Sequence, residues 1–211
     1  MTAPAAPDFD ALFAGSDDPW RFRTRWYERR KRALTLAALP RERYRRGFEP
    51  GCANGELAAA LAARCDALVA ADASPRAVGL AAERLRGTTG VELACLAVPA
   101  AWPPGRFDLV VISELAYYLD AADRRRLAER IRASLEPGGT VLACHWRAPI
   151  DDAHCDGDTV HAELDVALGL PRRGGWVDED MRIDAWFESA GSVGDPRGPD
   201  PGGRASCHAS R

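Results

Sequence analysis

The sequence predicts an α/β fold built on a mostly parallel β-sheet, with helices on both faces and one antiparallel strand at or near its edge. Strand and helix patterns alternate as far as residue 168, which is typical of parallel sheets with crossover helices. The apolar run at 106–113 has the composition of a strand buried on both faces. Two strand patterns, 172–177 and 181–187, then follow each other without a helix and indicate a closing hairpin.

The first 45 residues predict a helical cap. Phe9, Leu12 and Phe13 recur at helical spacing, and Asp18-Pro19 predicts a helix start because Asp caps helices and Pro suits their first turn. From there one side of a helix, or of a broken pair, that ends at Leu39-Pro40 is expected to carry Trp20, Trp26, Tyr27, Leu34, Ala37 and Ala38. Such a stripe ordinarily packs into the core. It could equally fold across the mouth of a nucleotide site.

Residues 46–187 predict the α/β domain itself. Strands are expected at 46–49, 67–71, 91–98, 106–113 and 140–145, and helices at 56–64, 75–86, 121–135 and 159–168. Ser74 is expected to cap the second of these helices. The run Glu136-Pro137-Gly138-Gly139 predicts a tight turn before the fifth strand.

Residues 188–211 differ in kind from the rest. They are rich in Gly and Pro, hold no aromatic residue, and have Val193 as their only branched aliphatic. Such a segment buries too little apolar surface to offset the entropy cost of ordering, so it is predicted to be a disordered tail.

Composition excludes several classes of protein. The 211 residues are 46% apolar and 28% charged with a net charge of −3, which gives no general attraction to nucleic acid or membrane. No apolar run reaches the 18 or so residues that span a bilayer, and Met1–Asp10 has no features of a secretion signal. Six cysteines without C-x-x-C spacing favour a reducing cytoplasm. Nothing in the sequence indicates an oligomeric state.

One segment is strongly basic. Between Arg21 and Arg46 there are eleven basic residues and two acids. This pattern could form a phosphate-binding face. A solvated helix surface is the favoured interpretation.

A glycine turn after the first strand holds the most informative pattern. In Glu49-Pro50-Gly51-Cys52-Ala53-Asn54-Gly55 the middle position of G-x-G-x-x-G is Ala53, and no Walker motif is present. The preceding Glu49 would repel a pyrophosphate and suits a ligand that carries positive charge. Asp72, at the end of the second strand, is placed to accept hydrogen bonds from a ribose. S-adenosylmethionine, with a sulfonium, an ammonium and a ribose diol, fits both acids.

At this point the chain resembles the class I S-adenosylmethionine-dependent methyltransferases. The resemblance rests on four motifs in order: Glu49–Gly55, Asp72, Phe107-Asp108-Leu109-Val110 and Leu135-Glu136-Pro137-Gly138-Gly139. A closer resemblance, over residues 8–187, is to the NodS-like (nodulation protein S) family. It is carried by Asp18-Pro19-Trp20, Trp26-Tyr27-Glu28-Arg29-Arg30-Lys31, Ser113-Glu114-Leu115-Ala116-Tyr117-Tyr118-Leu119, His145-Trp146-Arg147 and Gly157-Asp158-Thr159-Val160-His161.

The resemblance implies a Rossmann-like seven-stranded sheet with the cofactor over the carboxyl ends of strands one and two. It implies that Glu49 binds near the methionine amino group, that Asp72 binds the ribose, and that Trp20 and Tyr27 cover the cofactor. The implied cofactor-binding residues are Trp20, Tyr27, Glu49, Gly51, Cys52, Ala53, Gly55, Asp72, Ala73 and Ser113. S-adenosyl-L-methionine is the implied cofactor, and S-adenosyl-L-homocysteine is its product.

The chain departs from the family pattern in two places. The family has an acid after strand three that holds the adenine amino group, where this chain has Ala97-Val98-Pro99. Adenine binding is therefore expected to rest on backbone groups and apolar contact, or to be weakened. The tail at 188–211 is also unlike the family, which ends soon after its last strand.

Methyl transfer is an in-line displacement that needs alignment and desolvation rather than a nucleophilic side chain. An amine acceptor must be neutral to attack, so a nearby carboxylate or histidine assists as base or hydrogen-bond acceptor. Glu114 is the first candidate, with Tyr117 and Tyr118 shaping the acceptor pocket, and His145 is the second. The alternatives are a dipole-favoured acid at a helix start for Glu114 and a hydrogen-bonded interior histidine for His145.

Three functions follow as hypotheses. The preferred one is methylation of a small-molecule acceptor, an amine such as an amino sugar or oligosaccharide, since the nodulation branch acts on the amine of a deacetylated chito-oligosaccharide. A nucleic-acid methyltransferase is opposed by Ser113-Glu114-Leu115-Ala116 and by the lack of a Pro-Cys nucleophile. A domain with lost cofactor affinity is suggested by Ala97. No metal is expected, because the spacing of His154, Cys155, Asp156, Asp158 and His161 matches no zinc pattern.

Overall fold

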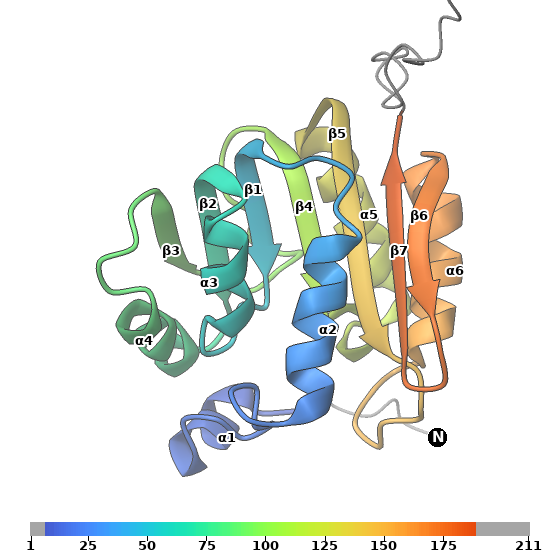
Figure 1. The fold of residues 1–211 in the computed structure, drawn as a ribbon. Helices are drawn as coiled ribbons and strands as arrows, with labels where there is room; N and C mark the ends of the chain where they lie inside the picture. The colour runs from blue at the N-terminus through green and yellow to red at the C-terminus, as the bar shows by residue number, and fades with distance from the viewer. Residues whose placement is uncertain (1–6, 189–211) are drawn as a thin grey trace, which may run out of the picture.

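A seven-stranded sheet lies between two layers of helices in the computed structural model, which describes residues 7–188 (Figure 1). The strand order is β3-β2-β1-β4-β5-β7-β6. The strands are β1 (Tyr44–Pro50), β2 (Cys65–Asp72), β3 (Val91–Cys95), β4 (Phe107–Ser113), β5 (Leu135–Trp146), β6 (Arg172–Val177) and β7 (Met181–Phe187). Neighbouring strands from β3 to β5 are parallel, and β7 is antiparallel to both β5 and β6. The predicted fold class is confirmed.

Helices cover both faces of this sheet, with α2, α3 and α4 on one face and α5 and α6 on the other (Figure 1). The helices are α1 (Phe9–Gly15), α2 (Trp26–Ala37), α3 (Glu56–Ala62), α4 (Pro75–Arg84), the 3-10 turn η1 (Ala116–Tyr118), α5 (Ala121–Ser134) and α6 (Gly157–Leu168). Each face has its own buried cluster. Because strand side chains alternate, β4 sends Leu109 and Val111 to one cluster and Val110 and Ile112 to the other.

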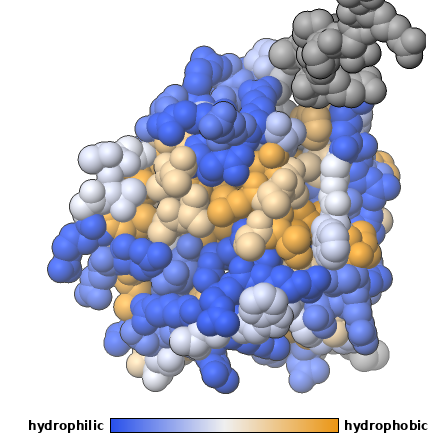
Figure 2. All heavy atoms as spheres, in the orientation of Figure 1, coloured by the Kyte–Doolittle hydropathy of each residue, from blue (hydrophilic) through white to orange (hydrophobic). Residues whose placement is uncertain are grey.

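The outer surface of the first helical layer is partly apolar. Figure 2 shows apolar residues gathered over α3 and the adjoining part of α2, between bands of hydrophilic residues. Leu34 and Leu36 of α2 and Leu57 of α3 are partly buried there and pack against the core. The two helices therefore share one apolar seam, which attaches the N-terminal segment to the domain.

The predicted helix start at Asp18-Pro19 is wrong, because α2 begins only at Trp26. The Asp18 carboxylate instead accepts hydrogen bonds from the backbone N–H groups of Phe22 and Arg23, at 2.7 and 3.1 Å. Arg21 has a φ of +60°, in the left-handed region that a right-handed helix does not use. Residues 16–25 consequently form turns, and the cap is a short helix, a turn segment and a longer helix.

The predicted apolar stripe on α2 is only partly correct. Trp26 is 68% exposed and is no part of the core. The buried residues of α2 are instead Glu28, Lys31 and Thr35, spaced i, i+3 and i+7 along one side. The inner face of this helix is therefore polar in part, and its two charged members are paired with each other, which offsets part of their desolvation cost.

The largest differences from the predicted strand boundaries are in β3 and β5. β3 ends at Cys95, so residues 96–98 are free of the sheet. β5 begins at Leu135, and the pairing jumps from Phe107↔Leu135 to Leu109↔Thr140. The predicted tight turn at 136–139 is therefore an irregularity inside β5, with Gly138 at a φ of +71°.

Other predicted features are confirmed. Ser74 caps α4 by accepting a hydrogen bond from the Ala77 N–H at 3.1 Å, and β6 and β7 have the predicted bounds. Within residues 7–188 no helix is both long and apolar enough to cross a membrane. The predicted tail, apart from Glu188, lies outside the described residues.

Candidate active site

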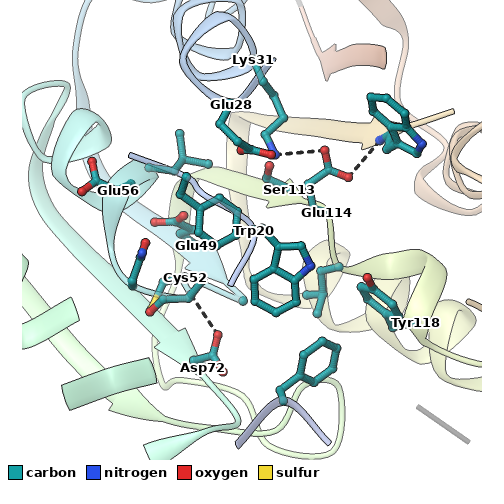
Figure 3. Close-up of a pocket in the computed structure, with 18 of the residues that line it drawn as sticks. Trp20, Glu28, Lys31, Glu49, Cys52, Glu56, Asp72, Ser113, Glu114 and Tyr118 are labelled. Atoms are coloured by element: carbon teal, nitrogen blue, oxygen red, sulfur yellow. Dashed lines mark hydrogen bonds and ion pairs between the residues drawn. The ribbon is translucent and has the colours of Figure 1, made fainter. Parts of the chain in front are cut away.

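A cavity of about 400 Å³ opens at the carboxyl ends of β1, β2 and β4 (Figure 3). The switch in strand order between β1 and β4 lies here, which is where open α/β sheets bind their ligands. The cavity brings together most of the predicted site residues: Trp20, Tyr27, Glu49, Gly51, Cys52, Ala53, Asp72, Ala73, Ser113, Glu114 and Tyr117. Gly55 and His145 do not line it.

The glycine turn follows the end of β1 and forms one wall of the cavity. Its backbone is left-handed at Gly51 and Ala53, with φ of +74° and +49°. The N–H of Ala53 donates to Asp72 Oδ2 at 2.9 Å, and the N–H groups of Gly51 and Cys52 donate to the Ala71 carbonyl. These bonds join the turn to the end of β2, so the two predicted halves of the site are held in one geometry.

Gly55 has a packing role rather than a lining role. Its φ is +80°, and a Cβ added there would lie 3.0 Å from the Cα of Ala81 on α4. The start of α3 can therefore approach α4 closely only with glycine at this position. The expectation that Gly55 contacts the cofactor is not supported by this placement.

Glu49 is a buried carboxylate without a partner. It is 2% exposed, and its Oε2 has no hydrogen-bond partner among residues 7–188. Burial, and secondarily the charge of Asp72, raises the pKa of Glu49 well above its ordinary value. A cation beside Glu49 would relieve this penalty, so the side chain has the environment of a cation-binding group.

Asp72 lies at the end of β2 and is 9% exposed. Its two oxygens accept hydrogen bonds from the N–H groups of Ala53 and Ser74, each at 2.9 Å. Burial raises the pKa of Asp72, while these two bonds favour the ionised form and oppose the rise. The carboxylate is thereby held rigidly at the cavity wall, with its remaining lone pairs free to accept from a ligand.

Aromatic side chains from the N-terminal segment cover the cavity. The Trp20 ring lies 5.5 Å from those of Phe13 and Phe22 and 6.3 Å from that of Phe9. Phe9 in turn meets Tyr118 edge-on at 5.1 Å. Trp20 therefore lines the cavity and packs against other aromatic residues at once, which limits the access of water.

The cavity end near β3 is apolar. Leu96, Ala97 and Val98 line it, just beyond the last residue of the strand. The departure at Ala97 thus lies at the cavity itself and leaves this end without the acid typical of the family.

Glu114, just after β4, is the most densely hydrogen-bonded side chain of the cavity. Its Oε1 accepts from the Tyr27 hydroxyl and the Lys31 ammonium at 2.9 and 3.0 Å, and its Oε2 accepts from the Tyr117 hydroxyl and the Trp146 N–H. Its backbone φ of +53° is left-handed, a strain that these four contacts hold in place.

These contacts do not favour Glu114 as a proton acceptor. Burial alone would raise its pKa, but the charge of Lys31 and the donated hydrogen bonds outweigh burial and lower the pKa to about 2. Glu114 is thus an anion at neutral pH with four donors already bound. Its geometry suits an electrostatic anchor better than the base that the sequence suggested.

Glu28 and Lys31 were missed by the sequence analysis. The Lys31 ammonium lies 2.8 Å from Glu28 Oε2 and 3.0 Å from Glu114 Oε1 (Figure 3). Burial opposes the charge on Lys31, but the two carboxylates raise its pKa. The spacing of Glu28, Lys31 and Thr35 along one helix side was the available signal, but such a polar stripe ordinarily faces solvent.

His145 is an interior residue and does not reach the cavity. It is fully buried, its Nε2 accepts from the Ala116 N–H at 3.3 Å, and its Nδ1 lies 3.1 Å from Nε2 of His161. His161 Nδ1 lies 2.8 Å from the Asp184 carboxylate. Both imidazoles are then neutral Nδ1–H tautomers in a single hydrogen-bonded chain.

The pKa of His145 agrees with its place in this row of hydrogen bonds. Burial, with the neighbouring His161, lowers the pKa of His145 to about 3. A histidine with both ring nitrogens bound and no access to the cavity cannot serve as the base. The placement therefore corrects the catalytic role predicted for His145 and supports the interior role weighed against it.

The metal interpretation finds no support in residues 7–188, where no three metal-binding side chains cluster. Asp156 caps α6 by accepting from the Thr159 N–H at 2.7 Å. Asp158 pairs with Arg147 at 2.9 Å. Turn and cap chemistry, as expected, accounts for these acids.

Comparison with known proteins places this geometry in a family. The profile described as "Methyltransferase domain" matches residues 48–141. A crystal structure of a candidate methyltransferase from Pseudomonas syringae is 52% identical, covers 78% of this chain and 100% of its own, and superposes with a TM-score of 0.71. The chain belongs to the class I methyltransferase family.

Nodulation protein S is a relative of this methyltransferase. The Rhizobium tropici protein is 30% identical over 157 residues, which are 72% of this chain and 64% of the relative, slightly less than two thirds of its length. The N-methyltransferase NodS of Bradyrhizobium japonicum WM9, solved with S-adenosyl-L-homocysteine, is 24% identical and has a TM-score of 0.72. The superposition covers 85% of this chain and 95% of the Bradyrhizobium chain, and it supports the shared fold.

Proposed function

We propose that the protein transfers a methyl group from S-adenosylmethionine to the nitrogen of a small-molecule amine, such as an amino sugar or oligosaccharide. The observation that carries this proposal is the buried carboxylate of Glu49, whose Oε2 has no partner in the described chain and whose environment suits a cation. S-adenosylmethionine carries two cationic groups, and a cavity of about 400 Å³ is of the usual size for such a ligand.

The residues present fit this cofactor. Glu49 would bind the methionine ammonium, Asp72 would accept from the ribose hydroxyls, and Ala97 with its neighbours would contact the adenine. Trp20 and Tyr27 would exclude water from the reacting atoms. When bound, the cofactor supplies a methyl carbon whose bond to sulfur breaks, with its electron pair, as the bond to the acceptor nitrogen forms.

The charge of one cavity cluster and the known function of a related protein both favour an amine as the methyl acceptor. The buried cluster of Glu28, Glu114 and Lys31 sums to one negative charge, and Arg25 and Arg32 line the cavity around it. An ammonium group would neutralise that charge. The Bradyrhizobium relative is named an N-methyltransferase, which supports the same acceptor atom.

A nucleic-acid acceptor receives less support. Arg43 and Arg45 of the basic segment pair with Asp66 and Glu136, and the Arg46 N–H bonds Asp108, all at the amino ends of the strands. The cavity lies at the opposite ends of the parallel strands. Arg43, Arg45 and Arg46 therefore do not form a basic path to the cavity, although Arg25 and Arg32 of the same segment line it. The proposed location is the cytoplasm. Five cysteines of residues 7–188 are free thiols, as is usual in a reducing compartment.

Two measurements test the proposal. Calorimetry with S-adenosylhomocysteine is expected to show binding, and failure to bind at millimolar ligand would remove the cofactor assignment. A screen with methyl-labelled cofactor against amino sugars, small amines, carboxylates and RNA is expected to label amines. Labelling of carboxylates or RNA alone would replace the acceptor class while leaving the cofactor in place.

A further inference from the structure

Two carboxylates share one ammonium at the cavity. The side chains of Lys31, Glu28 and Glu114 are 5%, 6% and 17% exposed, and all three line the cavity. Their net charge is one negative. Arg25 and Arg32 also line the cavity, and the charge of Arg32 offsets part of this negative charge. Because a buried charge is costly where its compensation is incomplete, the cluster still favours an additional cation.

The two carboxylates differ in what they already bind. Glu114 accepts four hydrogen bonds from Tyr27, Lys31, Tyr117 and Trp146. Glu28 meets Lys31 as an ion pair through Oε2 at 2.8 Å, but this oxygen has no hydrogen-bond partner among residues 7–188. An incoming donor therefore finds a free oxygen on Glu28 and none on Glu114.

We propose that Glu28 is the catalytic base of this methyltransferase: the acceptor binds as an alkylammonium ion beside Glu28 and gives it one proton before its nitrogen attacks. The inference rests on the proposed function, since it names the group that prepares the amine acceptor. The substrate class is accordingly an amine that is protonated in solution at neutral pH.

The proton transfer balances within the cluster. One N–H bond of the ammonium breaks, an O–H bond forms on the Glu28 carboxylate, and the electron pair of the broken bond stays on nitrogen as the attacking lone pair. The net charge of acceptor and cluster together is unchanged. After transfer the product leaves as a methylammonium ion, and the Glu28 carboxyl returns its proton to water.

The surroundings of Glu28 favour this step. Burial raises the pKa of Glu28, and the charge of Glu114 adds to the rise, while Lys31 and Arg32 oppose it. The Tyr27 hydroxyl and the Cys144 thiol are the other titratable groups nearby, and burial raises the pKa of both. Lys31, bound to Glu114 as well, keeps the carboxylate oriented in both protonation states.

The step is needed because of the acceptor's own chemistry. An ammonium ion has no lone pair, and an alkylammonium with a pKa of about 10, like that of a lysine, is neutral to only about one part in a thousand at pH 7. An amino sugar is less basic, so its neutral fraction is larger, but that fraction still falls about tenfold for each pH unit below its pKa. A base positioned beside the bound ammonium removes its proton, so the acceptor need not be neutral in solution. General bases typically raise the reaction rate by about 100-fold or more. Without Glu28 the enzyme must wait for the rare neutral amine.

The test compares Glu28→Gln with the wild type and with Glu163→Gln. Glu163 pairs with Arg124 between α5 and α6, away from the cavity, so its variant is the matched control for losing a carboxylate. S-adenosylhomocysteine affinity and thermal unfolding are measured first. Glu28→Gln is expected to fold and to bind the ligand within about threefold of wild type, because Lys31 keeps its partner Glu114.

Kinetics with glucosamine provide the readout. Wild-type kcat/KM is expected to be flat between the pKa of Glu28 and that of the amine. For Glu28→Gln it is expected to be at least about 100-fold lower at the acidic end of this range. It should then rise about tenfold per pH unit towards the acceptor's pKa, since only the neutral amine reacts. A structural defect would lower the rate without this slope, and Glu28→Asp should recover part of the flat profile.

The outcomes separate the inference from the proposed function. Methylation of glucosamine by the wild type, with the steep profile confined to Glu28→Gln, supports both. Wild-type methylation of glucosamine with an unchanged rate and profile in Glu28→Gln overturns the inference and leaves the function standing. Wild-type labelling of other acceptor classes and of no amine overturns both.

Discussion

The Lys31 ammonium lies 3.0 Å from Oε1 of Glu114, although 83 positions separate the two residues in the chain. One belongs to the N-terminal helix α2 and the other follows the central strand β4. This contact links the N-terminal cap to the end of β4 at the cavity. It also sets the charge of this part of the cavity, because Lys31 is the ammonium shared by Glu28 and Glu114.

Lys31→Met is expected to destabilise the protein. It leaves two buried carboxylates without their cation, and breaking a buried pair in this way typically costs about 3–5 kcal/mol. Urea unfolding at neutral pH measures the loss. Arg43→Ala is the control, because it removes an exposed pair with Asp66 and should cost less than about 1 kcal/mol. Equal, small effects of both variants would contradict the buried pairing.

Glu49→Gln is expected to stabilise the ligand-free protein and to weaken cofactor binding. The pKa of Glu49 is raised in the folded state, so ionisation costs stability as pH rises above about 4.5. Removing the charge should therefore raise the free energy of unfolding at neutral pH. Urea unfolding between pH 4 and pH 7 should show a flatter pH dependence in the variant.

The same variant is expected to bind S-adenosylhomocysteine about 10–100-fold more weakly, as loss of a charge-assisted contact implies. Calorimetry at neutral pH checks this expectation. A variant that gains stability and keeps full affinity would place the methionine ammonium elsewhere.

Asp72→Ala is expected to abolish most binding of S-adenosylhomocysteine. It removes the acceptor predicted for the ribose and also the bonds that hold the Ala53 and Ser74 N–H groups. Asp72→Asn separates these effects, because it retains a side-chain oxygen but no charge, and should lose about 10–100-fold. Calorimetry that finds unchanged affinity in both variants would show that the ribose lies elsewhere.

Ala97→Asp is expected to tighten binding by about fivefold. An acid at this cavity position can accept a hydrogen bond from the adenine amino group, worth about 1 kcal/mol. The inosine analogue of S-adenosylhomocysteine, which lacks that amino group, is the matched ligand. Its affinity should not improve, and an equal gain for both ligands would contradict adenine binding at this end.

His145→Asn is expected to change acid stability rather than the chemistry. The pKa of His145 falls from 6.5 to about 3 on folding, so the unfolded chain binds the proton first. Stability is then lost as pH falls below about 6.5, at about 1.4 kcal/mol per pH unit. Urea unfolding at pH 6, 5 and 4 should show a shallower loss in the variant. A folded variant with wild-type acid behaviour and no activity would restore a catalytic role to His145.

Local sequence patterns were sufficient for most of the fold. The β4 run predicted a strand buried on both faces, and Ser74 predicted the start of α4, because each depends on neighbours in the chain. The helix expected at Asp18-Pro19 failed for a related reason. Asp18 has the same cap chemistry in a turn as in a helix, and the left-handed backbone at Arg21 is not visible in the sequence.

The acids and glycines at the strand ends were also readable from the sequence. Glu49, Gly51 and Asp72 reach the cavity because a parallel sheet brings the carboxyl ends of its strands to one edge. Gly55 belongs to the same motif but faces α4. Its neighbour is decided by how α3 and α4 pack together, which the motif does not show.

The sequence by itself determined the α/β sheet, the glycine turn and the acids that suit a cationic nucleotide, since these follow from periodicity and from the order of strands. Only the tertiary structure decided how the charges of the cavity are shared. Its packing turned Glu28 and Lys31 of α2 inward, surrounded Glu114 with donors, and left His145 in the interior. The physical reason is that burial and partners set the properties of an ionisable group, and those partners lie far away in the chain.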